Sequence, residues 1–353
     1  MRIVVAMSGG VDSSVAAGLL VEQGHEVIGL HTRQHDATTK TAGRCCGEDD
    51  ALDARAVADQ LGIPFYVVNL KEAFQEAVVD DFVAEFARGR TPNPCVRCNG
   101  LLRFRVLLAR ARALGAEAMA TGHYARVLDG RLMTARETGK DQSYFLWQIP
   151  ATALPYTRFP LGDMTKDEVR AHAARLGLSV AEKAESQEIC FVPDDDHVRV
   201  VREARPDLDA SGTIVDESGA VVGKHDAYYR FTVGQRRGIG VGLGKPRYVR
   251  SIDPVTRTVT IGDDPLHRGV LASGAKFFER PAKNDLVYAR LRHRGALVPC
   301  AIEGDEPLHV RFLAPARAAT PGQSIVFYAG DRATVLGGAL VDRSIDPVAE
   351  ERA

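Results

Sequence analysis

The stretch Ser8-Gly9-Gly10-Val11-Asp12-Ser13-Ser14 decides the fold of the first part of this chain. It follows an apolar run over residues 3–7, which is typical of a buried parallel strand, and it precedes an apolar-periodic segment over 15–20, which predicts a helix. Glycines at such a turn let successive backbone N–H groups point into one concavity. The helix N-terminus and the serine hydroxyls add further partners for an anion. The stretch therefore predicts a phosphate-binding loop.

Two interpretations of this loop compete. In the simpler one it is a Gly/Ser turn in which Asp12 or Ser13 caps the helix. The Walker form is excluded, because the lysine of G-x-x-x-x-G-K-[ST] is missing. The whole string after a hydrophobic strand resembles the PP-loop of the ATP pyrophosphatases, which split ATP between its α and β phosphates and adenylate a carbonyl oxygen. That resemblance implies ATP as substrate and Mg²⁺ to offset phosphate charge, with Asp12 organising the metal or the loop.

Length and composition limit the class of protein. The chain has 353 residues, enough for two or three domains, and 45% hydrophobic with 26% charged residues is ordinary for a globular protein. No apolar stretch approaches the roughly 20 residues of a membrane span, and the N-terminus enters a strand without a leader. Six cysteines without secretory features argue against a disulfide scaffold. We therefore expect a cytoplasmic protein with no membrane partner.

The net charge of −1 gives no global sign of nucleic-acid binding, but two local runs are strongly basic. Residues 86–112 hold seven arginines and no acidic residue, and residues 223–250 hold seven basic residues and one aspartate. Such runs form either a solvated face or a surface for a polyanion. The second run includes Gly238, Gly240, Gly242 and Gly244, which we interpret as a loop because no strand–turn–helix pattern surrounds them.

Alternating periodicities predict an α/β fold with a doubly wound parallel sheet, in which ligands bind beyond the carboxyl ends of the strands. Asp129-Gly130 predicts a hairpin, and Thr165-x-x-Glu168 predicts a capping box for a helix that stops at Gly177. After about residue 210 the pattern becomes mainly β. The expected strands cover residues 26–31, 65–69, 117–121, 213–222, 248–261, 286–292, 308–312 and 324–328, and the expected helices cover 51–61, 71–87 and 101–114.

Two cysteine contexts carry chemical interest. Cys95 and Cys98 form a C-x-x-C in the first basic run, just ahead of a predicted helix, and Cys190 stands between isoleucine and phenylalanine. Arginines and a helix N-terminus both lower a thiol pKa, so they favour a nucleophilic thiolate. The alternatives are that Cys190 is a core residue and that the C-x-x-C, a weak zinc signal on its own, is structural. Cys45 and Cys46 fall in a predicted loop, and Cys300 falls in a β pattern and is expected to be buried.

Taken together, these segments resemble the bacterial tRNA-specific 2-thiouridylase family, which thiolates the wobble uridine of certain tRNAs. The resemblance implies three domains: a PP-loop (HUP-like) catalytic domain over 1–208, a small central tRNA-binding domain over 209–270, and a C-terminal β-barrel over 271–353. The matching stretches are 6–14, Arg44-Cys45-Cys46-Gly47, Asp53-Ala54-Arg55, 91–99, 120–125, 140–146, Glu188-Ile189-Cys190-Phe191 and 232–238.

The family resemblance also implies site residues. Cys98 is implied as the nucleophile and Cys190 as the carrier of a persulfide, the two closing as a disulfide when the thiolated base is released. Relatives often have Asp in place of Cys95 and Met in place of Thr32. The implied nucleotide-binding residues are Ala6, Met7, Ser8, Gly9, Gly10, Val11, Asp12, Ser13, Thr32 and Gly122. The implied tRNA-binding residues are Asn93, Pro94, Cys95, His123, Lys140, Asp141, Gln142, Arg292, His293 and Gln323, the first three beside the target base.

The implied partners are the anticodon arm of tRNA and a sulfur donor, either a persulfide-carrying protein or a cysteine desulfurase. Three alternatives stay open from the sequence. In the first, Cys95, Cys98 and Cys190 hold a [4Fe–4S] cluster with one open iron for the same reaction. In the second, the chain is a PP-loop amide ligase acting on a small molecule. In the third, it is an RNA-binding module without catalysis.

Overall fold

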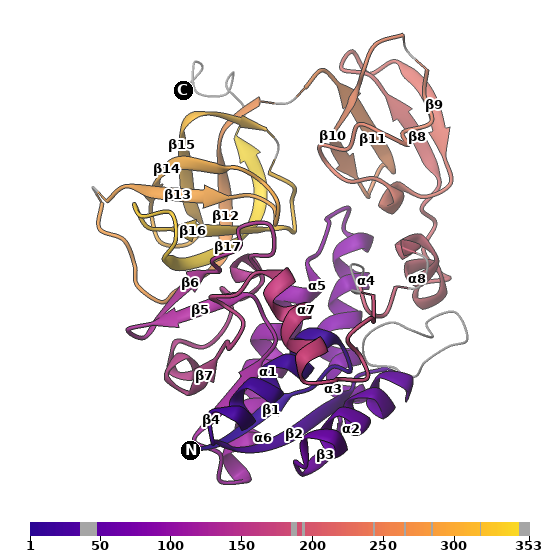
Figure 1. The fold of residues 1–353 in the computed structure, drawn as a ribbon. Helices are drawn as coiled ribbons and strands as arrows, with labels where there is room; N and C mark the ends of the chain where they lie inside the picture. The colour runs from indigo at the N-terminus through magenta and orange to yellow at the C-terminus, as the bar shows by residue number, and fades with distance from the viewer. Residues whose placement is uncertain are drawn as a thin grey trace. The chain divides into compact units, whose positions relative to one another are not determined.

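A computed structural model describes residues 1–35, 48–184, 189–192, 195–242, 244–264, 266–283, 285–317 and 319–345 (Figure 1). The chain divides into two compact units. The first comprises Met1–Val79, Cys95–Asp195 and Ala333–Val335. The second comprises Asp80–Pro94, Asp196–Arg332 and Leu336–Ala353.

The first unit is built on a parallel five-stranded sheet with the strand order β3-β2-β1-β4-β7. β1 lies in the middle, where Val4 pairs with Ile28 on one side and Met119 on the other. The predicted α/β alternation is confirmed. The strands of the unit are β1 (Arg2–Ala6), β2 (Glu26–Arg33), β3 (Phe65–Asn69), β4 (Ala118–Thr121), β5 (Ala125–Leu128), β6 (Arg131–Thr134) and β7 (Thr157–Arg158).

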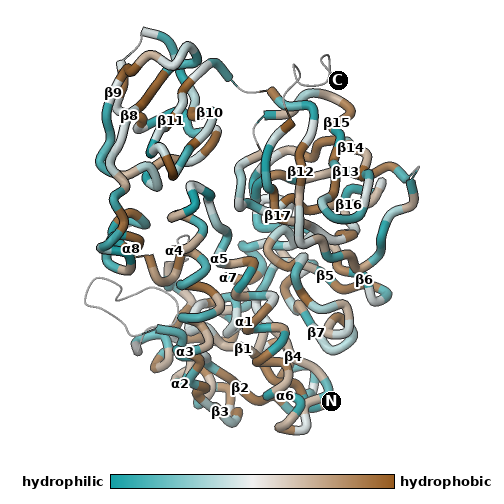
Figure 2. Tube along the Cα trace, turned by 180° about the vertical axis from the view of Figure 1, so that it is seen from behind, coloured by the Kyte–Doolittle hydropathy of each residue, from teal (hydrophilic) through white to brown (hydrophobic). Residues whose placement is uncertain are grey.

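Helices cover the middle of this sheet, where β1 and β2 are mostly apolar (Figure 2) and mostly buried. Ile3 and Val5 of β1 pack in one core with apolar residues of α1, α2 and α7. The helical segments are α1 (Val11–Glu22), α2 (Glu48–Leu61), α3 (Lys71–Phe74), η1 (Gln75–Val79), α5 (Pro94–Arg97), η2 (Cys98–Leu107), α6 (Leu108–Ala113), η3 (Ser143–Phe145), η4 (Ala151–Tyr156) and α7 (Lys166–Arg175).

Local signals in the first unit are largely confirmed. Asp129 and Gly130, both with positive φ, turn β5 into β6. The Thr165 side chain accepts from the backbone N–H of Glu168, whose side chain accepts in return, so the predicted capping box begins α7. The helix predicted over 101–114 begins earlier, at Pro94, and passes through the π-helical segment η2. The C-x-x-C therefore lies within helical turns and not ahead of them, which corrects the prediction.

The second unit is mainly β, as predicted. It contains a four-stranded sheet of order β10-β11-β8-β9 and a closed barrel of order β12-β15-β14-β13-β16-β17. The helical segments are α4 (Asp80–Ala87), α8 (His197–Ala204) and η6 (Tyr228–Arg230). The strands are β8 (Gly212–Val215), β9 (Val221–His225), β10 (Tyr248–Asp253), β11 (Thr258–Gly262), β12 (Leu266–Phe277), β13 (Val287–Arg290), β14 (Leu297–Glu303), β15 (Leu308–Arg317), β16 (Ser324–Tyr328) and β17 (Val335–Ile345).

Two predicted strands are each divided by a turn. The segment 213–222 becomes β8 and β9, because the Asp216 carboxylate accepts from the backbone N–H groups of Ser218 and Ala220 and closes a turn. The segment 248–261 becomes β10 and β11, because the Asp253 carboxylate accepts from the N–H groups of Val255 and Thr256. Short acidic side chains that accept from backbone N–H groups two to four residues ahead are a turn signal that hydrophobic alternation hides.

The glycine run after residue 237 forms a loop, with positive φ at Gly238, Gly240 and Gly244. The predicted loop is confirmed there. Within the described ranges, no helix is both long and apolar enough to cross a membrane.

Candidate active site

A pocket of about 230 Å³ lies at the carboxyl ends of β1, β2 and β4 in the first unit. These strands bring residues from distant parts of the sequence to one edge of the sheet, where ligands of parallel sheets bind. Nine of the ten predicted nucleotide-binding residues line the pocket, and Gly9 does not. The lining residues are Ala6, Met7, Ser8, Gly10, Val11, Asp12, Ser13, Leu30, Thr32, Asp50, Arg103, Leu107, Thr121, Gly122, His123, Tyr124, Lys140, Gln142, Lys183 and Ala184.

Hydrogen bonds between a serine side chain and the backbone hold the loop in a compact conformation. Ser13 Oγ accepts from the backbone N–H of Ser8 at 3.0 Å and donates to the Gly10 carbonyl at 3.1 Å. α1 begins after Gly10, and within the described part of the chain no side chain caps it. The interpretation in which Asp12 or Ser13 caps the helix is therefore wrong. The first N–H groups of α1 are without side-chain acceptors there and suit an anion.

Two glycines are required by close approaches to backbone. Gly9 has φ +77°, and a Cβ there would lie 2.2 Å from the Asp50 carbonyl oxygen. A Cβ on Gly122 would lie 2.6 Å from the backbone nitrogen of Ser13. Gly9 therefore shapes the path of the loop although it does not line the pocket. Gly122 lets β4 approach the start of α1.

Asp12 is held from outside the loop. Lys166 Nζ, at the first turn of α7, lies 2.6 Å from Asp12 Oδ1, and the Tyr124 hydroxyl donates to the same oxygen at 3.0 Å. The Lys166 side chain is only 9% exposed. A buried cation paired with a carboxylate fixes the position of both. These contacts support the loop-organising role of Asp12.

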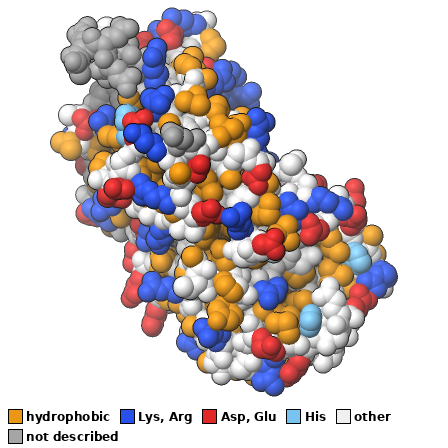
Figure 3. Space-filling model, turned by 90° about the vertical axis from the view of Figure 1, so that its left-hand side faces the viewer, with side chains coloured by type: hydrophobic (Ala, Val, Ile, Leu, Met, Phe, Trp, Pro, Cys, Tyr) orange, Lys and Arg blue, Asp and Glu red, His pale blue; other side chains and the backbone are white. Residues whose placement is uncertain are grey.

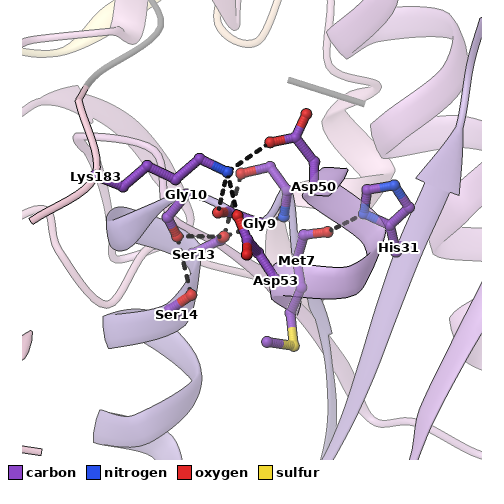
Figure 4. Close-up of polar contacts among 10 residues, drawn as sticks. Met7, Gly9, Gly10, Ser13, Ser14, His31, Asp50, Asp53 and Lys183 are labelled. Atoms are coloured by element: carbon purple, nitrogen blue, oxygen red, sulfur yellow. Dashed lines mark hydrogen bonds and ion pairs between the residues drawn. The ribbon is translucent and has the colours of Figure 1, made fainter. Parts of the chain in front are cut away.

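Lys183 is the second lysine beside the loop. Its Nζ donates to the Gly9 carbonyl at 3.1 Å and forms ion pairs with Asp50 at 2.7 Å and Asp53 at 2.5 Å (Figure 4). Burial lowers the pKa of this amine, but its hydrogen bonds to Asp50 and Asp53 outweigh burial and raise the pKa above its ordinary value. The side chain therefore carries a positive charge at the pocket.

His123, predicted to contact tRNA, lines the same pocket. Its Nδ1 lies 2.8 Å from Thr121 Oγ1, and its Nε2 lies 3.4 Å from a guanidinium nitrogen of Arg103. Arginine only donates, so Nε2 accepts and Nδ1 carries the proton. Burial, together with the charge of Arg103, lowers the pKa of His123 to about 3. The imidazole is therefore neutral near pH 7.

The three residues predicted to touch tRNA after Gly139 differ in position. Lys140 and Gln142 line the pocket. The Asp141 carboxylate is buried and accepts from the N–H groups of Ala135 and Ser143 and from the Ser143 hydroxyl. It thereby holds the loop that presents its two neighbours.

Cys98 is buried beside the pocket. Gln34 Nε2 lies 3.7 Å from Cys98 Sγ and 3.3 Å from Thr32 Oγ1, so a buried amide connects the cysteine to a residue that lines the pocket. Cys98 belongs to a hydrophobic cluster with Phe74, against which Cys190 packs, half-buried. Cysteines 92 positions apart in the sequence are thus gathered in one cluster of the first unit.

The expected low pKa of Cys98 is wrong for this structure. Burial raises the pKa of the Cys98 thiol above its ordinary value, although the charge of Arg103 and the hydrogen bond from Gln34 act in the opposite direction. A thiol in this position needs a change in its surroundings before it becomes a thiolate at neutral pH. The arginines of the basic run do not offset desolvation.

We expect iodoacetamide to modify the exposed Cys95 well before Cys98 at pH 7.5. Because the raised pKa keeps Cys98 protonated, its modification rate should still be rising above pH 9, the ordinary value. Peptide mass spectrometry after timed alkylation measures both rates in the same protein. Equal rates at pH 7.5 would contradict the buried, protonated state.

The arrangement of the cysteines does not fit an iron–sulfur cluster. Cys95 is exposed while Cys98 is buried. Among the residues that the structure describes, no three His, Cys, Asp or Glu side chains are grouped to hold a metal ion. Cys45 and Cys46 lie outside the described residues. Cys300 is buried in β14 as predicted, and burial raises its pKa to about 12.

The second unit contains the remaining predicted tRNA contacts except Cys95. Gln323 Nε2 donates to the carbonyls of Thr91 and Pro92, each at 3.0 Å, directly before Asn93 and Pro94. The Thr91 N–H also donates to the Pro321 carbonyl at 2.8 Å. Gln323 thus holds the segment that leads to the predicted base contacts. Arg292 is exposed and His293 half-buried in the turn between β13 and β14.

In the folded protein, acidic side chains neutralise part of the positive charge that the two basic runs carry in the sequence. Over the face shown in Figure 3, Lys and Arg side chains are interspersed with Asp and Glu. Several arginines of the runs form ion pairs: Arg88 and Arg90 with Glu85, Arg230 with Asp226, and Arg247 with Glu217 and Asp263. Arg236 and Arg237 are exposed and form no ion pair with described residues. They are the better candidates for a polyanion contact.

Sequence reasoning missed several residues of the site. Asp50 precedes the quoted Asp53 by three positions, so the two share one face of a helix, and this spacing is a usable signal. Arg103 lies in the first basic run, which was predicted as a possible polyanion surface and not as part of this pocket. Gln34, Lys166 and Lys183 had no local signal, because only the fold brings them to the loop.

Comparisons with known proteins show the family of the chain. Three family models match consecutive parts of the chain: the tRNA methyl transferase HUP domain over residues 1–194, the tRNA methyl transferase PRC-barrel domain over 203–263, and the aminomethyltransferase β-barrel domain over 268–341. The tRNA-specific 2-thiouridylase MnmA of Geotalea uraniireducens is 51% identical, covering 98% of this chain and 96% of its own. The protein of the same name from Geobacter metallireducens is 49% identical, and the match covers 98% of this chain and 97% of that protein. That from Acidothermus cellulolyticus is 47% identical, covering 98% of both. The chain therefore belongs to the tRNA-specific 2-thiouridylase family.

Proposed function

We propose that this protein uses ATP to replace the C2 oxygen of the wobble uridine in tRNA with sulfur. Membership of the 2-thiouridylase family supports tRNA thiolation. The observation that carries the proposal is the connection between the pocket and the cysteine: Gln34 bonds to both Thr32 and Cys98. The buried amide of Gln34 places the proposed nucleotide site next to the proposed sulfur site. Such an arrangement suits a reaction in which ATP activates C2 of the base and sulfur then attacks the same atom.

The first step is activation of the base. The C2 oxygen attacks the α-phosphate of ATP, an O–P bond forms, the α–β anhydride breaks, and pyrophosphate leaves. The Ser8–Ser14 loop and the uncapped start of α1 are suited to hold the phosphates. Mg²⁺ enters with ATP as part of the substrate and offsets phosphate charge. Gly122 and Thr32 line the remainder of the pocket.

The second step is substitution by sulfur. A persulfide on Cys190 attacks C2, and AMP leaves as the C–O bond breaks. The Cys98 thiolate then attacks Cys190 Sγ, which forms a Cys98–Cys190 disulfide and leaves the sulfur on the base. The packing of both cysteines in one cluster supports a reaction between them. A thiol reductant returns the disulfide to two thiols, and a persulfide-carrying protein or a cysteine desulfurase reloads Cys190.

The uridine has to leave its stack to reach this site, as bases do in other base-modifying enzymes. Unstacked bases are available in RNA loops, and the surrounding arm is gripped through its phosphates. We assign Asn93, Pro94 and Cys95 to the border of the target base. Lys140, Gln142, Arg292, His293 and Gln323 remain predicted tRNA contacts, His123 acts from inside the pocket, and Asp141 acts by holding its loop.

We expect the affinity for tRNA to fall steeply with salt, partly through Arg236 and Arg237. Replacing both by alanine should lower the slope of log K against log salt by about 2, since each phosphate contact contributes about 1. Filter binding from 50 to 300 mM KCl measures the slope. Arg230→Ala is the matched control, because Arg230 is already paired with Asp226. A double variant with the wild-type slope would remove the pair from the interface.

The direct test of the proposed function is mass spectrometry of tRNA nucleosides. The protein is incubated with unmodified tRNA, MgATP and a persulfide source, and 2-thiouridine, AMP and pyrophosphate are measured together. We expect one AMP and one pyrophosphate for each 2-thiouridine formed. Formation of 2-thiouridine without ATP, or consumption of ATP without tRNA at the same rate, would contradict the proposal.

A further inference from the structure

We propose that Lys183 is the cation that binds the triphosphate of ATP in this pocket, supplying the positive charge that the Ser8–Ser14 loop itself lacks. The proposal rests on the proposed use of ATP and goes further by naming the residue that recognises the phosphates. Lys183 lies 174 positions after Gly9 of the loop in sequence, and the fold brings it there.

The position of Lys183 is the first argument. The residue lines the pocket, and its Nζ donates to the carbonyl of Gly9 inside the loop at 3.1 Å (Figure 4). The Lys183 ammonium therefore lies next to the position that phosphates would occupy if the loop and the start of α1 bound them. The side chain is 23% exposed, so the amine reaches the pocket without being free in solvent.

The charge around Lys183 is the second argument. One ammonium faces two carboxylates, so the side chains of Lys183, Asp50 and Asp53 taken together carry an excess negative charge. Such a group repels a triphosphate unless one carboxylate gives way. Asp50 is buried, with a side chain 3% exposed, whereas the Asp53 side chain is 41% exposed and can be released into water. We therefore infer that ATP replaces Asp53 as a partner of Lys183 while Asp50 keeps holding the amine.

The neighbouring cations leave this role to Lys183. Lys166 is held by Asp12 and does not line the pocket. Lys140 lines the pocket but is a predicted tRNA contact. Arg103 lines the pocket but is directed to His123. Lys183, by contrast, bonds directly to the loop, and its flexible four-carbon stem allows an exchange of partners.

The proposal is tested by calorimetric binding of MgATP and of adenosine to the full-length protein. Lys183→Met should weaken ATP binding by about 10- to 100-fold, the range of a hydrogen bond to a charged group, and leave adenosine binding unchanged. Lys183→Arg should restore most of the ATP affinity. Lys276→Met, which removes one charge at an exposed position of β12, is the matched control.

Asp53→Asn tests the exchange of partners independently. Removing the competing carboxylate should strengthen ATP binding by about 2- to 5-fold and leave adenosine binding unchanged. Because this variant keeps Lys183 and the buried Asp50, it provides a result even where Lys183→Met folds poorly.

Three outcomes separate the possibilities. Equal weakening of ATP and adenosine by Lys183→Met would overturn the proposal, since the lysine would then only support the fold. Unchanged ATP affinity in that variant would also overturn it, while leaving the proposed function intact. Wild-type protein that binds no ATP would instead overturn the proposed function.

Discussion

Replacing Cys190 with serine is expected to stop sulfur transfer to tRNA while adenylation continues. A hydroxyl cannot carry a persulfide, so 2-thiouridine should fall by on the order of 1,000-fold or more. Pyrophosphate release in the presence of tRNA should persist, because the pocket residues are unchanged. Nucleoside mass spectrometry and a pyrophosphate assay on the same reaction measure the two steps.

A variant of the second cysteine, Cys98→Ser, tests whether sulfur transfer from Cys190 precedes the attack by Cys98. With Cys98→Ser, the base should remain joined to Cys190 through a disulfide, so a covalent protein–tRNA adduct should accumulate and dissolve on addition of dithiothreitol. Cys300→Ala is the matched control, since that buried cysteine lies in the barrel. Full thiolation by Cys190→Ser would remove Cys190 from the mechanism.

Replacing Gly122 with alanine is the second change for which we expect a large effect. The new Cβ would lie 2.6 Å from Ser13 N and 2.7 Å from the Asp12 carbonyl carbon, so the start of α1 has to move away from β4. We expect ATP affinity to fall by about 10- to 100-fold and the free energy of unfolding to fall by about 1–3 kcal/mol. Isothermal calorimetry and urea unfolding measure the two quantities.

Gly242→Ala controls for the change of residue type, because nothing lies within 4 Å of a Cβ at that exposed glycine. Wild-type ATP affinity in Gly122→Ala would show that the loop does not need the close approach of β4. It would then also weaken the assignment of this pocket to the nucleotide.

The fold of the first unit was largely predictable because its signals are local. Hydrophobic runs predicted β3 with its observed bounds, and the capping box predicted the start of α7. The barrel was harder to predict. β17 contains Gly337, whose absent side chain lets Lys276 O approach to 2.2 Å from the position of a Cβ, and β14 contains Pro299. Glycine and proline in a sequence suggest turns, whereas here Gly337 allows close strand packing and Pro299 lies inside a strand of the closed barrel.

The site was predictable where a motif carries its residues together. Most of the loop, from Ser8 to Ser13 without Gly9, and the segment around His123 line the pocket, as expected of residues at strand ends. Lys166 and Lys183 could not be predicted, because their partners are Asp12 and Asp50 and a lone lysine in a polar stretch is usually solvated. The state of Cys98 was mispredicted for a related reason. Charge is visible in a sequence, but burial, which dominates its pKa, is a property of the fold.

The hydrogen bonds from Gln323 to Thr91 and Pro92 have a consequence for making a smaller enzyme. A fragment ending before β12 would retain every residue that lines the nucleotide pocket, since the last of these is Ala184. It would nevertheless lose the hydrogen bonds from Gln323 that hold Thr91 and Pro92, directly before Asn93. The truncated protein should therefore still bind ATP but no longer position the residues predicted to contact the target base. A shortened enzyme would need another structure to hold Thr91 and Pro92 in place of the barrel.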